Sequence, residues 1–315
     1  MNYPAPKDHA LPGTVGSDGH SRRTSWRGGS LYDGLRDLIP IAERIKIGSY
    51  RPEPLMIARW EERPGKIREI AFPSVYDRLV GAVLLEVLEP VLDPILSDWQ
   101  HGYRASRICG RKIEVNGFKG IPRGSTKIVA RRLLCAVRSG RRYLWELDVV
   151  NAFPSANRAI LRKLLVEDGC SERFAKIIIR LLGDRAVDPA QGNKEIEVGG
   201  VPLGNPVGPL VFGLYVSGVY KAVPSGTILP SYADNFYLAT KTQEEGGSIT
   251  ILLKIYCREV LGLEIEVKQA WHPECGSTFN ILERHVGGGW MLQEDGEGRI
   301  TCRGPRDSLR RATHE

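Results

Sequence analysis

Two aspartates in this sequence of 315 residues are candidates for holding a metal ion. Asp234 lies at the tip of segment 231–239, which reads as a strand, a tight turn and a second strand. Asp148 falls near the end of an apolar segment, 143–150, that is predicted to be another strand. Two carboxylates on adjacent strands make the all-oxygen site that Mg²⁺ prefers, and two such ions can stabilise the attacking and leaving oxygens of a phosphoryl transfer. Asp and Asn are also ordinary turn residues, so Asp234 by itself indicates a turn as readily as a ligand.

The order of the predicted elements brings together two residues that are 86 positions apart. The strand that contains Asp148 is followed by two helices, a hairpin-like segment, an apolar helix, the hairpin of Asp234, a further helix and a further strand. This order is typical of an α+β fold with a split β-α-β unit, whose mostly antiparallel sheet carries its helices on one face. The expected helices are 156–167, 172–182, 210–219 and one that Ser248 caps and Leu261 ends, and the later strands are 264–267, 278–283, 290–293 and 299–302.

The segment before this sheet is predicted to be a β-hairpin followed by a helix. Residues 54–73 alternate around a Pro-Gly turn, and Lys66 and Arg68 lie on the turn and the return strand. Two cations on a hairpin suit contact with phosphate, although exposed strand charges are equally ordinary. Ser74 with Asp77 three residues on predicts the start of a helix. Its recurring apolar residues, which predict a core helix, are Leu79, Val80, Val83, Leu84, Val87 and Leu88.

Charge indicates a polyanionic partner. The chain carries 44 Lys and Arg against 37 Asp and Glu, a net charge of +7. Segment 103–142 alone holds twelve basic residues and one acid, and aromatic residues are interleaved with them. This pattern favours a nucleic-acid track over a solvated basic face, which is the ordinary alternative. The predicted contacts from this track are Tyr103, Arg104, Arg107, Arg131 and Arg132.

Composition argues against several other classes of protein. The six cysteines are scattered without a C-x-x-C pair, which predicts reduced thiols rather than a disulfide framework or a zinc site. No apolar run approaches the roughly 20 residues that a membrane span needs, and the N-terminus has no apolar signal core. We therefore expect a soluble cytoplasmic protein with no membrane partner.

Several segments resemble motifs of one family. Tyr232-Ala233-Asp234-Asn235 is similar to the YADD box of bacterial reverse transcriptases, the type shared by group II intron maturases, retrons, diversity-generating elements and defence-associated enzymes. Other segments resemble further motifs of that family, in the family order, between about residues 50 and 285. They are Lys66 and Arg68 with 72–78, then 101–107, 148–153 and 200–209, and finally 261–263 with Lys268.

The resemblance implies a right-hand polymerase fold with fingers, a split β-α-β palm and a thumb that is minimal or absent. It divides the chain into four expected parts. They are a flexible or partner-ordered arm at 1–30, fingers with the basic track at 31–142, a catalytic palm at 143–285, and a short C-terminal hairpin and tail at 286–315 in place of a full thumb. The expected setting is the bacterial cytoplasm, and the expected role is in antiphage defence.

The resemblance also implies roles for individual residues. Asp148, Asp234 and the carbonyl of Val149 would hold two Mg²⁺ ions, with Mn²⁺ as a substitute, and Lys268 would act as a general acid. Phe153 would exclude the 2′-hydroxyl of a ribonucleotide, so the expected substrates are dNTPs. The other residues implied in binding are Lys66, Arg68 and Gly204 for the dNTP and the new base pair, and Arg78 and Leu203 for the nucleic acid.

Three residues depart from the family pattern. Asn235 replaces the second aspartate of the YADD box, Leu203 replaces a glutamine and Gly208 replaces a serine. The leading interpretation is an RNA-directed DNA polymerase that uses an RNA template or a non-coding RNA and makes a DNA product. A protein partner or a homo-oligomer would then help to hold the primer-template duplex, which a full thumb usually does. The alternatives are a template-restricted or protein-primed DNA polymerase and a catalytically inactive subunit that binds RNA or a partner. An RNA-dependent RNA polymerase is disfavoured by Phe153.

Overall fold

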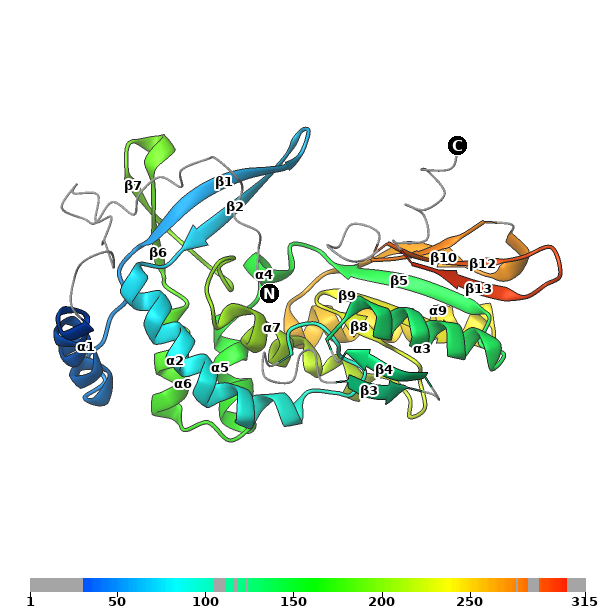
Figure 1. Cartoon of the computed structure of the whole chain (residues 1–315), viewed down its shortest axis with the longest axis horizontal. Helices are drawn as coiled ribbons and strands as arrows, with labels where there is room; N and C mark the ends of the chain where they lie inside the picture. Colours follow the sequence, from blue (N-terminus) through cyan, green and yellow to red (C-terminus); the bar gives the residue numbers. More distant parts are fainter. Residues whose placement is uncertain are drawn as a thin grey trace.

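The computed structural model describes residues 31–104, 112–115, 118–122, 124–275, 277–282 and 289–304. The expected arm at 1–30 and the residue Arg107 lie outside these ranges. The molecule is elongated, with one sheet and its helices at one end and a second, larger assembly of sheets at the other (Figure 1). Among the described helices, none is long and apolar enough to span a membrane.

The N-terminal half is built around a four-stranded sheet in the order β2-β1-β6-β7. Strands β1 (Leu55–Arg63) and β2 (Lys66–Phe72) form the predicted hairpin, while β6 (Arg185–Asp188) and β7 (Lys194–Glu197) come from much later in the chain. Strand β6 pairs with β1 in parallel. Arg59 of β1 crosses to the buried carboxylate of Asp188 in β6 through two hydrogen bonds, 2.9 Å and 2.6 Å long. A charge pair therefore joins the hairpin to the later strands.

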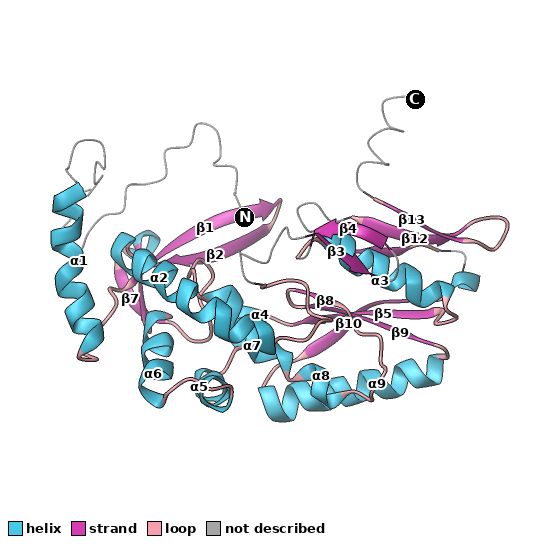
Figure 2. Ribbon diagram, turned by 60° about the horizontal axis from the view of Figure 1, so that its bottom comes forward, coloured by secondary structure: helices cyan, strands magenta, loops and turns pink. Residues whose placement is uncertain are grey.

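Helices α1 (Leu31–Lys46), α2 (Val75–Leu92), α5 (Arg158–Glu167) and α6 (Glu172–Leu181) lie beside this sheet (Figures 1 and 2). The predicted start of α2 is confirmed, because the Ser74 hydroxyl accepts from the amide of Asp77 and donates to its carboxylate. The prediction of a core helix was only half right. Val80, Leu84 and Leu88 are buried, whereas the apolar residues on the other face of α2 are exposed: Leu79, Val83, Val87 and Val91.

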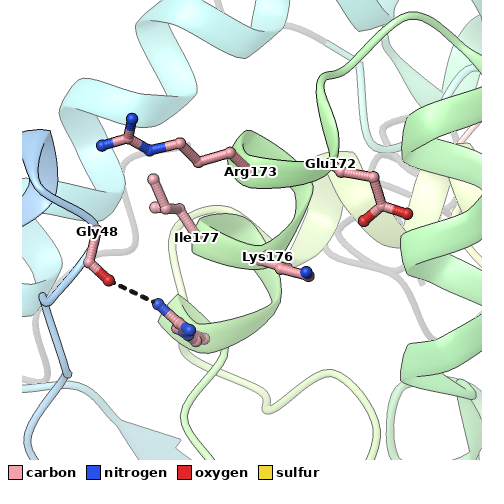
Figure 3. Close-up of a pocket in the computed structure, with 6 residues that line it drawn as sticks. Gly48, Glu172, Arg173, Lys176 and Ile177 are labelled. Atoms are coloured by element: carbon pink, nitrogen blue, oxygen red, sulfur yellow. Dashed lines mark hydrogen bonds between the residues drawn. The ribbon is translucent and has the colours of Figure 1, made fainter.

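Helix α6 also carries a small surface pocket. The pocket lies beside Gly48 (Figure 3). Its volume is about 360 Å³. Arg180 donates to the carbonyl of Gly48 at 2.9 Å, and Arg173 donates to the carbonyl of Lys46 at the end of α1. These arginines satisfy carbonyls that the end of α1 leaves without helical partners. The pocket contains none of the predicted site residues.

The second half of the molecule centres on an antiparallel sheet in the order β10-β5-β9-β8. Its strands are β5 (Tyr143–Val149), β8 (Ser231–Tyr232), β9 (Asn235–Thr240) and β10 (Ile265–Trp271). Between β5 and β8 come the short α4 (Ala152–Ser155), α5 and α6, β6 and β7, and then α7 (Gly208–Ser217) and α8 (Val219–Ala222). Helix α7 is buried nearly all round, which explains its uniformly apolar sequence.

Both faces of this sheet are covered, so the prediction of helices on one face was wrong. Alternate residues of β5 point to opposite sides. Trp145, Leu147 and Val149 join a core with α9 (Gln243–Tyr256), and Leu144 joins a second core with α3 (Thr126–Arg138). The second core also includes the C-terminal sheet β11 (Phe279–Ile281), β12 (Trp290–Glu294) and β13 (Ile300–Arg303), which packs beyond α3.

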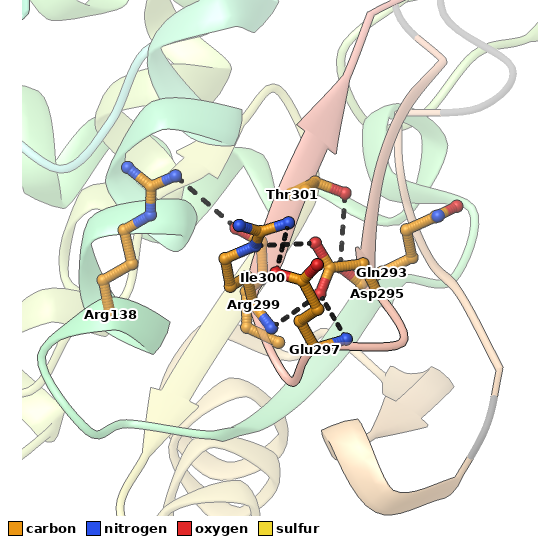
Figure 4. A network of polar contacts seen from close by, with 7 residues as sticks. All are labelled: Arg138, Gln293, Asp295, Glu297, Arg299, Ile300 and Thr301. Atoms are coloured by element: carbon orange, nitrogen blue, oxygen red, sulfur yellow. Dashed lines mark hydrogen bonds and ion pairs between the residues drawn. The ribbon is translucent and has the colours of Figure 1, made fainter.

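The C-terminal hairpin was predicted and is present. Its turn is held by the side chain of Asp295, which accepts from the amide and the guanidinium of Arg299 at 2.9 Å and 3.1 Å. Figure 4 shows this network, in which Arg138 of α3 also reaches the carbonyl of Ile300 at 3.5 Å. Strand β11 pairs with β12, so this sheet joins residues on the two sides of the expected boundary at 285. A further hairpin, β3 (Lys112–Val115) and β4 (Phe118–Pro122), lies near the N-terminal end of α3 (Figure 2).

The predicted start of the helix after β9 was wrong by six residues, because the cap is Thr242 and not Ser248. Helix α9 begins at Gln243, with the Thr242 side chain accepting from the amide of Glu245, and not at a cap on Ser248. The pair Gly246 and Gly247 looks like a helix-breaking turn in the sequence. Gly246 is instead required inside the helix, because a Cβ there would lie 1.8 Å from the ring of Trp145.

Candidate active site

Asp148 and Asp234 are brought together by the pairing of β5 with β9. Asp148 is in register with Asn235, the residue that follows Asp234. The amide of Val149 donates to the carbonyl of Asp234 at 3.3 Å, which ties the turn to the end of β5. Burial raises the pKa of Asp234 to about 6, and the charge of Asp148 contributes to the rise. The two carboxylates are thus close enough to repel each other.

The turn that carries Asp234 has an unusual backbone. Ala233, the residue before Asp234, adopts a left-handed conformation with a φ of 57°. The side chain of Tyr232, which precedes Ala233, is buried. A tight two-residue turn requires such a φ, which non-glycine residues rarely adopt. The side-chain amide of Asn235 donates to the carboxylate of Asp234 at 3.3 Å. Asn235 therefore supports the neighbouring carboxylate where the YADD pattern would add a second one.

The residues present suit a hard divalent cation. Asp148 and Asp234 offer carboxylate oxygens from adjacent strands, and a cation between them would offset the repulsion that raises the pKa of Asp234. Within the described ranges, no group of three or more His, Cys, Asp and Glu side chains is placed to hold a metal. The side chain of Val149 is buried in the core, so its backbone carbonyl is the only part of it that suits the predicted role as a ligand.

Lys268 reaches this site through an irregularity in β10. Val267 pairs with Leu147 and Gln269 pairs with Glu146, so Lys268 is the extra residue of a β-bulge. Its ammonium lies 3.4 Å from the Asp148 carboxylate and also pairs with Glu266. The hydrogen bond that Lys268 donates to Glu266 is the main reason that the pKa of Lys268 is raised, and Asp148 adds to the rise. The lysine is therefore held in its charged form beside Asp148.

Phe153 belongs to a cluster of three aromatic rings below the end of β5. It stacks on Phe212 of α7 with ring centroids 4.6 Å apart, and Tyr103 meets it edge-on at 5.4 Å. Tyr103 also meets Phe212 edge-on at 5.8 Å. These contacts fix the plane of the Phe153 ring, which is only partly buried. Tyr103, predicted to contact nucleic acid, is half-buried and supports Phe153.

The glycine-rich loop 199–208 is attached to β2. The carbonyl of Leu203 accepts from the amide of Ala71 at 2.9 Å. Gly204 has a φ of 102°, and a Cβ there would lie 2.9 Å from the carbonyl of Ala71. The close approach that Gly204 allows in the structure is therefore to the backbone of β2. This contact joins the loop to the strand that carries Arg68.

Three residues predicted to bind the triphosphate or the template lie on the β1–β2 hairpin and on α2: Lys66, Arg68 and Arg78. Arg68 is exposed on β2, and its charge lowers the pKa of Asp234, which places it within electrostatic reach of the site. Lys66 is the first residue of β2, and its side chain lies outside what the structure describes. Arg78 is exposed near the start of α2.

Much of the described part of the basic track makes internal contacts. The prediction that Arg104 contacts nucleic acid was wrong, because its side chain is buried. Its Nε lies 3.0 Å from the Asp93 carboxylate, and its guanidinium donates to three backbone carbonyls. Arg132 lies over the ring of Trp99 at 4.3 Å, and Arg142 pairs with Glu294 at 2.7 Å. Arg131 is partly exposed on α3. Charge counting missed these contacts because the acids and carbonyls that engage the cations lie in other segments.

Two residues beside the site were not singled out in the sequence. Phe212 forms the stacked partner of Phe153, but it lies in a helix whose uniform apolar character gives no hint of a special position. Gly102 packs against the backbone of the Asp234 turn. Its place within the segment 101–107, which resembles a family motif, is the one signal that pointed to it.

Comparisons with known proteins agree with this geometry. The family model described as "Reverse transcriptase (RNA-dependent DNA polymerase)" matches residues 58–269. The group II intron-encoded protein LtrA of Lactococcus lactis subsp. cremoris is 23% identical over 186 residues, which are 58% of this chain and 27% of that protein. Protein YkfC of Escherichia coli K12 is 21% identical over 171 residues, 54% of this chain and 41% of that protein. The chain therefore matches less than half the length of either relative.

Solved structures show the same fold at low identity. Apo telomerase from Candida tropicalis superposes with a TM-score of 0.57 over 87% of this chain and 54% of that chain, at 10% sequence identity. A form of the same telomerase truncated from its C-terminal domain gives a TM-score of 0.51 over 86% of this chain and 60% of that chain, also at 10% identity. At this identity the likeness concerns the fold alone.

Proposed function

This chain belongs to the reverse transcriptase (RNA-dependent DNA polymerase) family, and from that premise we propose that it adds dNTPs to a 3′-hydroxyl under the direction of an RNA template. The observation that carries the proposal is the pairing of Asp148 with the turn of Asp234 at one end of the central sheet. Carboxylates held side by side on two strands are the ligands that two-metal phosphoryl transfer requires.

The proposal gives each site residue a role. Bound Mg²⁺ would supply the positive charge that stabilises the attacking and leaving oxygens, with Asp148, Asp234 and the carbonyl of Val149 as its ligands and Mn²⁺ as a substitute. Lys66 and Arg68 bind and orient the triphosphate from β2. Lys268, held charged beside Asp148, donates a proton to the departing pyrophosphate.

Phe153 sets the choice of sugar in this proposal. Its ring is fixed by Phe212 and Tyr103, so it does not move aside to admit a 2′-hydroxyl. The proposed substrates are therefore dNTPs, with an RNA template or a non-coding RNA and a DNA product as partners. Leu203 and Gly204 act from the loop that is attached to β2.

In this proposal, residues 31–142 act as the fingers, 143–285 as the palm and 286–315 as a short C-terminal addition. Several arginines of the basic track are engaged within the protein, which reduces the surface left for holding a duplex. We include a protein partner or a second copy of the chain in the proposal, because either would add surface that holds the duplex.

A second candidate function is an inactive subunit of the same fold that binds RNA or a partner protein. Asn235 favours it, because this residue supplies an amide where the family box has a carboxylate. The paired aspartates and the charged Lys268 favour the active enzyme.

The experiment that separates the two offers the purified protein a primed RNA of defined sequence with Mg²⁺ and dNTPs, and sequences the product. We expect DNA complementary to the template from the wild type, and no product from Asp234→Ala. Asp184→Ala, which removes an exposed carboxylate away from the site, serves as the matched control and is expected to behave as the wild type. An inactive wild type beside an active Asn235→Asp variant would establish the scaffold function instead. A DNA product unrelated to the template would support the template-restricted or protein-primed alternative.

The proposed setting, antiphage defence, is based on the resemblance to defence-associated bacterial reverse transcriptases. Plating phage on cells that express the wild type or Asp234→Ala tests it. Protection by the wild type alone is the expected result, and equal plaque counts in both strains would contradict it.

A further inference from the structure

Segment 99–104 crosses the back of the turn that carries Asp234. The amide of Ser231 donates to the carbonyl of Trp99 at 2.8 Å, and the amide of His101 donates to the carbonyl of Ser231 at 2.9 Å. Gln100 and Ser231 thus form a parallel β-bridge. The segment is in effect a short additional strand beside β8, although it comes from more than a hundred residues earlier in the chain.

Gly102 is the point of closest approach. A Cβ at this position would lie 2.1 Å from the amide nitrogen of Ala233, 2.8 Å from its Cα and 3.0 Å from the carbonyl carbon of Tyr232. All three atoms belong to the backbone, so no side chain can rotate to make room. A methyl group at position 102 therefore requires either the segment or the catalytic turn to move.

The segment has little freedom to retreat. The Gln100 amide donates to the carbonyl of Gly213 in α7 at 3.0 Å. Tyr103 packs edge-on against Phe153 and Phe212. Arg104 is buried and ion-paired with Asp93 just after α2. Because the segment is anchored on both sides of Gly102, the turn is the part that yields.

We infer that Gly102 is a positioning residue for the reaction: its missing side chain sets how far the turn of Ala233 and Asp234 lies from Asp148. The inference builds on the proposed polymerase function, which supplies the reaction to be measured. A carbon atom needs roughly 3.4 Å from such neighbours, so Gly102→Ala displaces the turn by about 1 Å. A misplacement of about 1 Å in a catalytic group lowers a rate by roughly 100-fold.

The test compares Gly102→Ala with Gly296→Ala, a matched control whose Cβ would meet nothing within 4 Å. Three quantities are measured: kcat for dNTP incorporation, the Mg²⁺ concentration at half-maximal rate, and the affinity for Mn²⁺ in the absence of nucleotides by electron paramagnetic resonance. For Gly102→Ala we expect kcat to fall by about 100-fold. We also expect the Mg²⁺ midpoint to rise and Mn²⁺ binding to weaken, while the affinity for primed template, a fourth quantity measured by fluorescence anisotropy, stays unchanged. Gly296→Ala is expected to match the wild type in all four.

Circular dichroism and thermal melting establish that Gly102→Ala is folded. If it is not, Gly213→Ala takes its place, because its Cβ would press on the same segment, 2.9 Å from the Gln100 amide and 3.1 Å from Tyr103. A smaller fall in kcat, about tenfold, is expected there because a side chain can yield in part. A folded variant with wild-type kcat, Mg²⁺ midpoint and Mn²⁺ affinity overturns the inference. The two failures can be told apart. If the wild type incorporates no dNTP, the proposed function is wrong. If Gly102→Ala still weakens Mn²⁺ binding in that case, Gly102 nevertheless positions the aspartates.

Discussion

Among single side chains, the proposed chemistry depends on keeping two like charges close together. Asp148 and Asp234 repel each other, and burial together with this repulsion raises the pKa of Asp234 to about 6. Lys268 and Arg68 supply positive charge from β10 and β2. Asn235 reduces the negative charge of the turn relative to a YADD box while donating to Asp234. The site therefore combines two carboxylates with flanking cations, an arrangement suited to a polyphosphate substrate.

Replacing Phe153 tests the choice of sugar. Phe153→Val shortens the side chain that packs on Phe212 and opens the space expected to face the 2′ position. We expect the ratio of rNTP to dNTP incorporation to rise on the order of 100-fold, since a missing steric block of a few carbon atoms changes discrimination by that order. Competition assays with labelled ATP and dATP measure the ratio. Phe174→Val, the same change at a partly buried residue of α6, is the control and should leave the ratio unchanged. An unchanged ratio in Phe153→Val would rule out the assignment.

Among the elements, the β1–β6 pairing joins the hairpin of Arg68 to strands that follow β5 in the chain. It contains only two residue pairs in register, and the ion pair of Arg59 with Asp188 reinforces it. The loop of Leu203 adds a second attachment on β2. The hairpin is thus held to the rest of the protein by a few polar contacts as well as by the small core around Leu55.

The Arg59–Asp188 pair predicts how stability depends on pH. The hydrogen bond from Arg59 is the main cause of the lowered pKa of Asp188 in the folded protein. A carboxyl whose folded pKa lies below its unfolded value of about 4 stabilises the fold above that pH, and the contribution is lost as pH falls through the folded pKa. We expect urea midpoints of the wild type to fall more steeply than those of Asp188→Asn as the pH drops below about 4. Asp188→Asn should also be less stable at pH 7; parallel pH profiles for the two proteins would contradict this.

Helix α9 offers a matched pair of glycines. Gly246→Ala places a methyl group on the ring of Trp145 in the core beneath the central sheet, and we expect it to destabilise the protein by about 1–3 kcal/mol. Gly247→Ala meets nothing within 4 Å and should stabilise it by up to about 1 kcal/mol, because alanine favours a helix more than glycine does. Thermal melting of the two variants measures the difference. Equal shifts would mean that α9 does not pack on Trp145 in this way.

For the molecule as a whole, the count of twelve basic residues in segment 103–142 overstates the surface that can bind nucleic acid, since Arg104 and Arg142 pair with Asp93 and Glu294 from outside the segment. The positive charge available for nucleic acid comes from other residues, and Arg131 of α3 is one that stays partly exposed. Figure 2 shows α3 on the face of the central sheet opposite α9.

Salt dependence of binding tests this distribution. We expect the affinity for primed RNA to fall as salt rises, and Arg131→Ala to weaken binding and reduce the slope of log affinity against log salt by about 1. Arg142→Ala, whose guanidinium already pairs with Glu294, serves as the control and should leave the slope unchanged. Fluorescence anisotropy over a salt series provides the slopes. The reverse order of effects would place the nucleic acid near Arg142, which follows the C-terminal end of α3.

The sequence was informative where a short segment determines its own structure. The apolar strand with Asp148, the turn of Asp234 and the cap at Ser74 were all recognisable from local patterns, and the antiparallel pairing of strands then followed. What depended on distant contacts was not predictable. The bulge that directs Lys268 toward Asp148 and the packing of Gly102 on Ala233 involve residues far apart in the chain. The partner of Arg104, Asp93, is 11 positions away, but it lies outside the basic segment and gives no local signal of the pair.

The central claim is that Asp148 and Asp234 form one metal-dependent site for nucleotide transfer. The most direct measurement is the rate of Mg²⁺-dependent dNTP incorporation on primed RNA by the wild type, Asp148→Asn and Asp234→Asn, which keep the shape of each side chain and remove its charge. The account predicts an active wild type and a loss of at least about 1,000-fold in each variant, because an amide lacks the negative charge with which these carboxylates would hold the metal. Incorporation within tenfold of the wild type in either variant would contradict it.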